Sequence, residues 1–192
     1  MAIKEFKLHS LFSSVVYQRE LSLNIKPIHN YCSKLKKSVK SASHSNQGGW
    51  QSPPITFSEL PELSSEIEKY ANIFKRTFLF KKPLKISIMW VNINNYKDSN
   101  IEHSHPNSIL SGVYYVKVPK DGGLLKFISP SLDVMARDWG ETEKEKYNHY
   151  NCEYWSFKPK ENILFLFPGW LRHSVLPHSS KTERVSLSFN LK

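Results

Sequence analysis

The sequence predicts a mainly β domain of the sandwich, barrel or jelly-roll kind, with helices near the N-terminal end packed on one sheet. Three observations lead to this prediction. The second half of the chain alternates short β-forming segments with turn residues, the first half carries two apolar stripes at helical spacing, and aromatic residues make up 13% of the chain. The 192 residues are enough for one hydrophobic core. We therefore expect a single domain over residues 1–192, with a helical support region at 1–82 and a jelly-roll core at 83–192.

The first half contains the elements that are expected to support the sheets. A short apolar run, Leu11 to Val16, is interpreted as an edge strand. Apolar residues recur at three- and four-residue steps over Ile25 to Val39 and again over Ser58 to Phe78, which predicts two helices. Ser58 can cap the second helix, and Pro61 suits its first turn. Both apolar stripes are expected to pack against a sheet.

Six strands are expected in the second half, separated by turns that contain proline, glycine or both. Short strands at regular spacing, with little helix between them, are typical of sandwiches, barrels and jelly rolls. The expected strands are Lys85 to Asn94, Leu110 to Val118, Gly123 to Ile128, Cys152 to Phe157, Asn162 to Phe167 and Arg184 to Leu191.

Two connecting segments have roles that the sequence leaves open. Ser45 to Ser52 is a loop by composition, and its Trp50 either plugs one end of the barrel or forms a wall of the active site. Ser129 to Asn151 is polar, charged and longer than most connections. It is either a lid or an insertion that contains a helical turn.

The chain is basic, because 27 Lys and Arg against 17 Asp and Glu give a formal charge of +10. The basic residues are mostly scattered and no nucleic-acid motif accompanies them, so solubility explains the charge better than a nucleic-acid partner does. The two cysteines, Cys32 and Cys152, are too few for a disulfide framework, so a reducing, cytoplasmic location is expected. Met1 to Phe12 lacks the apolar stretch of a signal peptide, and no stretch of the chain is long enough to span a membrane.

Three of the eight histidines occupy positions that suggest a metal site. His103 and His105 form an H-x-H pair just before an expected strand, and alternate residues of an extended segment point the same way. His173 lies far downstream, so folding would be needed to close the site. Imidazole ligands suit iron, copper, zinc or nickel, so the residues alone do not identify the metal.

Downstream of His173, an arginine and a serine are spaced in a way that suggests an anion-binding site. Arg184 and Ser186 lie on the same face of one expected strand. The planar guanidinium binds a carboxylate through two hydrogen bonds, and a serine hydroxyl adds a third. An arginine that points into a β-barrel would be a costly buried charge without an anionic partner. If Arg184 points outward instead, it is an ordinary surface residue.

The chain resembles the 2-oxoglutarate- and Fe(II)-dependent oxygenases of the double-stranded β-helix fold, which include the prolyl hydroxylases. The resemblance rests on three strings of residues and on the Gln47-Gly-Gly-Trp-Gln-Ser52 segment. All of these are similar to a family of such oxygenases that is frequent in phages and bacteria. The three strings are His103-Ser-His-Pro-Asn-Ser-Ile-Leu-Ser-Gly-Val-Tyr-Tyr-Val116, Phe167-Pro-Gly-Trp-Leu-Arg-His-Ser-Val175 and Arg184-Val-Ser-Leu-Ser-Phe-Asn190.

The resemblance implies a double-stranded β-helix, or jelly roll, and a role for each matching residue. His103 and His173 would bind Fe(II), while Arg184 and Ser186 would hold the far carboxylate of 2-oxoglutarate. Tyr115 matches a strand position that often hydrogen-bonds the same carboxylate, or else it is a core aromatic residue.

His105 is where the chain departs from the common pattern of two histidines and one carboxylate. Two interpretations remain open. Either His105 is the third ligand of a three-histidine site, or only His103 and His173 bind the metal and His105 lies behind them. We favour the first, because H-x-H reproduces the spacing of H-x-D and imidazole suits iron.

The activity implied by the resemblance is a dioxygenase that uses O2, releases succinate and CO2 and hydroxylates a side chain of a protein or peptide, or a small molecule. One alternative is a cupin-type dioxygenase with a three-histidine iron and no 2-oxoglutarate. Another is a basic binding module without enzyme activity. Candidates for substrate contact lie in the long connection and are Asp133, Arg137, Tyr147 and His149.

Overall fold

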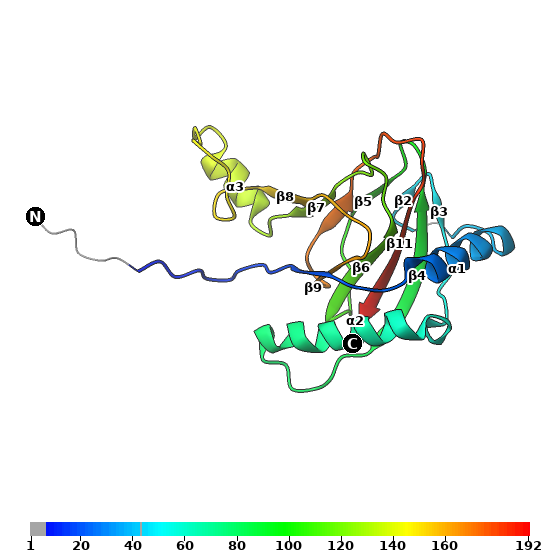
Figure 1. The fold of residues 1–192 in the computed structure, drawn as a ribbon. Coiled ribbons are helices and arrows are strands. Elements are labelled where there is room, and N and C mark those ends of the chain that lie inside the picture. The colour runs from blue at the N-terminus through cyan, green and yellow to red at the C-terminus, as the bar shows by residue number, and fades with distance from the viewer. Residues whose placement is uncertain (1–6, 43) are drawn as a thin grey trace, which may run out of the picture.

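The computed structural model describes residues 7–42 and 44–192, and these form two antiparallel sheets that face each other (Figure 1). The six-stranded sheet has the order β1 (Tyr17–Glu20), β9 (Ile163–Pro168), β6 (Leu110–Lys117), β11 (Arg184–Leu191), β4 (Ile86–Asn94) and β3 (Trp50–Gln51). The five-stranded sheet has the order β2 (Asn46–Gln47), β5 (Ser99–His103), β10 (His173–Val175), β7 (Leu125–Ile128) and β8 (Tyr154–Phe157). The expected mainly β fold is confirmed.

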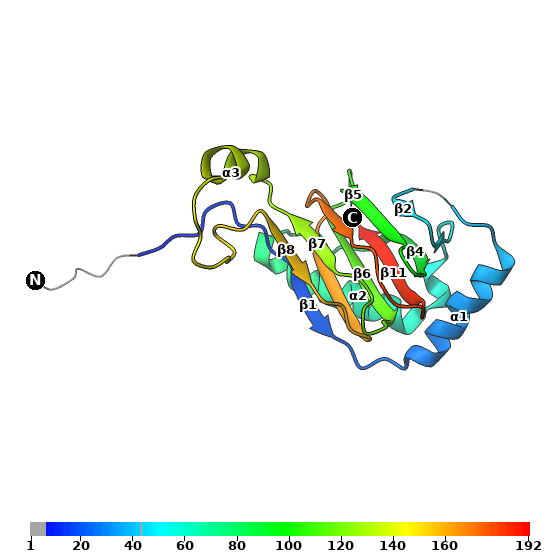
Figure 2. The ribbon, with the colours of Figure 1, turned by 90° about the horizontal axis from the view of Figure 1, so that it is seen from above.

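The six-stranded sheet carries a different core on each face. On its outer face, α1 (Ile25–Ser38) and α2 (Pro61–Phe74) cover a helix-side core, as predicted (Figure 2). On its inner face, an inter-sheet core fills the space toward the five-stranded sheet. The buried members of the inter-sheet core are Val113, Tyr115, Leu125, Phe127, Ile163, Phe165, Phe167 and Leu171.

Strand β11 shows how one sequence pattern serves both faces. Val185, Leu187 and Phe189 belong to the helix-side core, whereas Arg184 and Ser186 line a cavity between the sheets. This is the period of two that a strand imposes on its side chains. The apolar residues fix which face of β11 is turned to the helices, so the polar residues are turned inward.

The two main helices begin where their capping chemistry allows. Asn24 caps α1, since its side-chain oxygen accepts a hydrogen bond from the Lys26 amide at 3.2 Å. The prediction that Ser58 caps the second helix is wrong, because Ser58 lies in a 3₁₀ turn, Phe57–Glu59, and α2 begins at Pro61. A proline disfavours helical geometry in the residue before it and suits the first helical position, so Leu60 becomes the boundary.

One expected strand is wrong, and two strands that carry site residues were not expected. Leu11 to Val16 is not a strand; the strand is β1, which begins at Tyr17 and pairs with β9. The run is apolar for another reason, because Val15 packs on the helix-side core and Val16 on the inter-sheet core. Strands β5 and β10 were not expected from the sequence. Each of them contains a single apolar residue, so neither shows an alternating apolar pattern.

The long connection between β7 and β8 contains α3 (Leu132–Trp139), which has no buried residue and lies away from the two sheets (Figure 2). None of residues 129–151 lines the cavity between the sheets. Within the described residues, no helix has the length and apolar character needed to cross a membrane. Residues 1–6 of the Met1 to Phe12 stretch, for which no signal peptide was expected, lie outside the described residues.

Candidate metal and cosubstrate site

A cavity between the two sheets gathers most of the residues that the sequence singles out. It has about 500 Å³ of space not filled by protein atoms, part of it open to solvent. The five-stranded sheet and the loop after β5 supply the three histidines, and the six-stranded sheet supplies the arginine. The predicted site residues on its wall are His103, His105, Tyr115, His173, Arg184 and Ser186.

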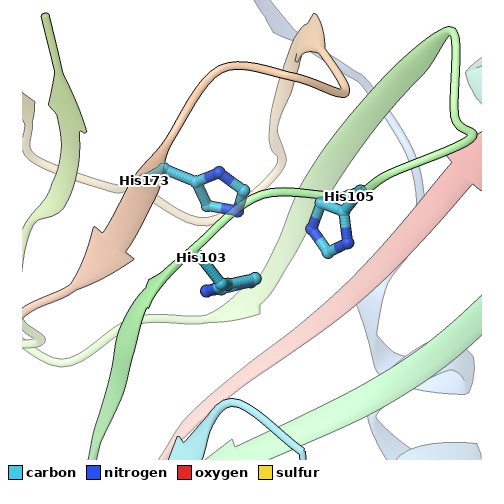
Figure 3. Close-up of side chains that lie close together, drawn as sticks. All are labelled: His103, His105 and His173. Carbon is cyan, nitrogen blue, oxygen red and sulfur yellow. The ribbon is translucent and has the colours of Figure 1, made fainter. Parts of the chain in front are cut away.

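The three histidines converge although they come from distant parts of the chain (Figure 3). His103 at the end of β5 pairs directly with His173 at the start of β10, so the sheet brings these two side by side. His105 follows in the loop after β5, and its amide donates a hydrogen bond to the Gly169 carbonyl at 2.8 Å, which fixes that loop. One ligand atom from each ring can be chosen so that all three lie within 4.8 Å of one another. This spacing suits a single metal ion.

Hydrogen bonds orient two of the three rings. The Nδ1 atom of His103 lies 2.7 Å from the Ile101 carbonyl oxygen, and Nδ1 of His173 lies 2.9 Å from the Leu171 carbonyl oxygen. Because a carbonyl only accepts, each Nδ1 carries the proton and each Nε2 keeps a free lone pair. Metal-binding histidines are held in the same way in other proteins. The ring of His105 instead lies near Trp90, with centroids 5.7 Å apart.

All three imidazoles favour their neutral form. Burial, and then the neighbouring His103, lower the pKa of His173 to about 3. Burial and the charge of His103 lower the pKa of His105 to about 4, and burial also lowers the pKa of His103. A metal binds the neutral imidazole, so at neutral pH no proton has to leave before a cation can enter.

The metal-free protein is therefore expected to lose stability as the pH falls from about 7 to about 5. The unfolded chain takes up protons near the ordinary histidine pKa of 6.5, whereas folded His105 and His173 stay neutral until the pH approaches 4 and 3. Between these limits the unfolded chain binds more protons, so acid favours unfolding. Melting temperatures of metal-free protein across this range test the expectation. Replacing the exposed His149 by Asn should leave the pH dependence intact, whereas replacing both His105 and His173 by Asn should weaken it.

Arg184 points inward, as the anion-site interpretation requires, and only 1% of its surface is exposed. Its Nη1 donates to the Gly122 carbonyl and its Nη2 to Oδ1 of Asn94 at 2.9 Å, while Nε has no partner among the described residues. No carboxylate of the described residues lies within the 4.0 Å of an ion pair with it. Burial lowers the pKa of Arg184, which shows how poorly the surroundings solvate its charge.

The other two residues predicted to hold the carboxylate lie beside Arg184. Ser186 is two residues further along β11 and directly opposite Tyr115 on β6. Both side chains are buried and line the cavity. Burial raises the pKa of Tyr115 to about 12 although the charge of Arg184 acts in the opposite direction, so the phenol stays protonated and can donate to an anion.

Sequence reasoning missed the contribution of β4 to the cavity. Trp90 and Asn92 line its wall, and Asn94 holds Arg184. Asn92 Nδ2 donates to Ser188 at 3.0 Å, whereas its buried Oδ1 has no partner among the described residues. A signal was present, because Asn92 and Asn94 are polar residues at alternate positions of an expected strand, and so share one of its faces.

Several residues considered for the site lie elsewhere. Trp50 packs in the helix-side core and donates to the Val39 carbonyl at 3.2 Å, so it is not a wall of the cavity. Phe167, in contrast, does line the cavity, and the centroid of its ring lies 4.6 Å from that of the His173 ring. The candidate substrate contacts in the long connection are absent from the cavity wall; they are Asp133, Arg137, Tyr147 and His149.

The residues present fit a metal ion at one end of the cavity and a carboxylate at the other. Three neutral imidazoles, two of them with Nε2 left free, form a donor set that suits iron. The buried guanidinium has a positive charge without an ion pair and an Nε–H without an acceptor, so an anion would satisfy both.

Comparisons with solved structures agree on the fold. A prolyl-4-hydroxylase from Pseudomonas putida has a TM-score of 0.64 and 15% identity, with 95% of this chain and 94% of that chain covered. The viral collagen prolyl hydroxylase of Paramecium bursaria Chlorella virus-1 has a TM-score of 0.59 and 15% identity, with 92% and 94% covered. HygX from Streptomyces hygroscopicus, solved with nickel and 2-oxoglutarate, has a TM-score of 0.59 and 10% identity, with 93% and 82% covered. These likenesses identify the double-stranded β-helix fold.

No curated protein matches the chain. A family model described as "Putative 2OG-Fe(II) oxygenase" matches residues 88–190, which is more than half of the chain and includes all three histidines and Arg184. The cofactors of this family are Fe(II) and 2-oxoglutarate, with O2 as cosubstrate. The chain therefore belongs to the family of 2OG-Fe(II) oxygenases.

Proposed function

We propose that the protein is an Fe(II)- and 2-oxoglutarate-dependent hydroxylase that acts on a protein or peptide side chain or on a small molecule. One observation carries the proposal: a single cavity has three converging neutral histidines at one end and a buried arginine without an ion pair at the other. This arrangement suits a cosubstrate that chelates a metal with its 2-oxo acid group and places a second carboxylate against a cation.

Each residue then has a defined task. His103, His105 and His173 would hold the metal, with the first and third oriented by backbone carbonyls. Arg184, Ser186 and Tyr115 would hold the distal carboxylate of 2-oxoglutarate. When bound, Fe(II) would activate O2, with 2-oxoglutarate as the donor of two electrons: one oxygen atom of O2 would enter succinate as CO2 leaves, and the other would be inserted into a C–H bond of the substrate. Phe167 and the other apolar residues of the inter-sheet core keep bulk water away from this chemistry.

The histidine triad contributes no negative charge, which has a consequence for binding. Of the two negative charges of the cosubstrate, one would lie at Fe(II) and the other against Arg184, so the only negative charge at the metal would come from the 2-oxo acid carboxylate and none from a protein carboxylate. Metal and 2-oxoglutarate are therefore expected to bind with strong mutual dependence, more than in a site with an aspartate ligand.

Hydroxylation and a peptide substrate are supported by the two prolyl hydroxylases among the similar structures, each covered over more than nine-tenths of its length. The same fold also serves other outcomes. SnoK, a carbocyclase from nogalamycin biosynthesis, has a TM-score of 0.64, and SnoN, an epimerase from the same biosynthesis, also has 0.64.

Purified protein reconstituted with Fe(II) is expected to bind 2-oxoglutarate without O2 and, once O2 is admitted with a substrate, to form succinate in a one-to-one ratio with hydroxylated product. Peptide libraries and small molecules should be assayed in parallel, with product mass as the readout. Failure to bind 2-oxoglutarate anaerobically would refute the proposal. A three-histidine dioxygenase of the cupin type would bind iron but ignore 2-oxoglutarate, and a non-enzymatic binding module would hold no stoichiometric iron.

A further inference from the structure

The guanidinium of Arg184 is held only by neutral groups. Nη1 donates to a backbone carbonyl, that of Gly122, and Nη2 donates to the side-chain amide oxygen of Asn94. Both acceptors fix the orientation of the guanidinium without cancelling its charge. The remaining Nε–H has no partner among the described residues. Among the described residues, the guanidinium of Arg184 is thus oriented by hydrogen bonds but forms no ion pair.

Position 94 determines whether that charge stays free. Asn94 lies directly opposite Arg184 in the pairing of β4 with β11, and 2% of its surface is exposed. An acidic side chain of the same shape here would form a buried ion pair with Arg184. The charge of the nearby Asp98 acts on Arg184 and raises its pKa, although burial outweighs this effect. Asp98 forms no ion pair with Arg184, and its Oδ2 accepts a hydrogen bond from the Asn95 amide at 2.6 Å in the turn after β4.

The backbone around Asn94 and Arg184 leaves little freedom for another arrangement. The Asn94 carbonyl lies 2.9 Å from Nε2 of His178, a histidine that is 1% exposed and that donates this hydrogen bond. On the other side, Gly123 has a φ of +75°, and a Cβ atom there would lie 2.3 Å from the Leu176 carbonyl oxygen and 3.0 Å from Nη1 of Arg184. The guanidinium is therefore confined between β4 and the turn before β7.

We propose that Asn94 is a specificity-determining residue, which reserves the charge of Arg184 for the distal carboxylate of the cosubstrate and so makes the site select 2-oxo acids that carry a second carboxylate. The inference rests on the proposed function. It adds that selection depends on a neutral hydrogen-bond acceptor beside the arginine, in addition to the arginine itself. A purely structural role of Asn94 would affect all ligands of the cavity alike.

The experiment compares two ligands in Fe(II)-loaded protein without O2: 2-oxoglutarate, and 2-oxopentanoate, which has the same carbon chain but no distal carboxylate. Calorimetry gives the dissociation constants. In N94D, the new carboxylate pairs with Arg184 and repels the incoming anion, so 2-oxoglutarate should bind about 100-fold more weakly or worse. The affinity for 2-oxopentanoate should change by no more than about threefold, because that ligand does not use the charge.

The matched control is N190D, which makes the same change on β11, where Asn190 accepts a hydrogen bond from Ser111 at 2.8 Å. It should keep the wild-type preference for 2-oxoglutarate. N94A, which stays neutral, should lose about tenfold in affinity for 2-oxoglutarate and little for 2-oxopentanoate; this variant carries the test if N94D does not fold. Equal effects on both ligands, or none, would overturn the inference. If wild-type protein binds no 2-oxoglutarate, the proposed function itself fails.

Discussion

Replacing Arg184 by alanine is expected to weaken 2-oxoglutarate binding by about 10²- to 10³-fold, while the protein still binds Fe(II). The guanidinium would otherwise make charge-assisted hydrogen bonds to the distal carboxylate, each of about 1.5–3 kcal/mol, and about 1.4 kcal/mol corresponds to a factor of ten. The histidines lie on the other sheet and in the loop after β5, so their geometry does not depend on Arg184. Anaerobic titrations with metal and with cosubstrate measure the two affinities separately.

Two further variants test whether the loss of 2-oxoglutarate affinity in R184A comes from the guanidinium group. R184K keeps the positive charge but loses the planar fork, so its affinity for 2-oxoglutarate should fall between those of the wild type and R184A. R19A removes an exposed arginine of β1 and should change neither affinity. If R184A bound 2-oxoglutarate as tightly as the wild type, the cosubstrate would have to bind elsewhere, and the assignment of this cavity would be wrong.

The sequence predicts the fold best where side chains alternate over a long stretch. The expected strand Arg184 to Leu191 has the bounds of β11, because its odd positions fill the helix-side core and its even positions are polar. Strands β5 and β10 escape prediction although they carry His103 and His173. They are short, and their residues are suited to the site rather than to the sheet, so no hydrophobic pattern marks them.

The features of the candidate site also differ in whether the sequence predicts them. Histidine spacing and the Arg-x-Ser pattern are properties of single segments, so sequence reasoning could find them. Asn94 becomes a partner of Arg184 only through the pairing of β4 with β11, which joins residues 90 positions apart. A polar residue in a buried strand indicates that some partner exists, but it does not say which one. The contacts that orient Nδ1 of His103 and of His173 also depend on backbone geometry, which no residue pattern specifies.

The two ends of the cavity complement each other in charge. One end presents neutral imidazoles to a cation, and the other presents a cation to an anion, so only the Arg184 end carries a charge before its ligand binds. In a low-dielectric cavity this unpaired charge costs free energy until an anion binds. The protein therefore meets the cost of desolvating Arg184 during folding, which leaves its charge available for binding.

The second large effect is expected at the triad, where His173→Ala should lower Fe(II) affinity by more than about 100-fold and abolish succinate formation. Of the three histidines it is the most buried, and Leu171 and Phe167 hold its ring in place. Equilibrium titration with Fe(II), with and without 2-oxoglutarate, gives the affinities, and H149A provides an exposed histidine as control. Stoichiometric, tight iron in H173A would show that the metal lies elsewhere.

The same titration decides the role of His105, whose ring can place a nitrogen within 4.8 Å of the ligand atoms of His103 and His173. If His105 is the third ligand, H105A should lose Fe(II) affinity about as severely as H173A; if it only lies behind two ligands, the loss should stay within about 10- to 100-fold. H105D sharpens the test, since it restores a carboxylate at the spacing of the common triad. Its negative charge should tighten Fe(II) binding in the absence of 2-oxoglutarate and so reduce the dependence of each ligand on the other. Unchanged coupling in H105D would mean that position 105 does not contact the metal.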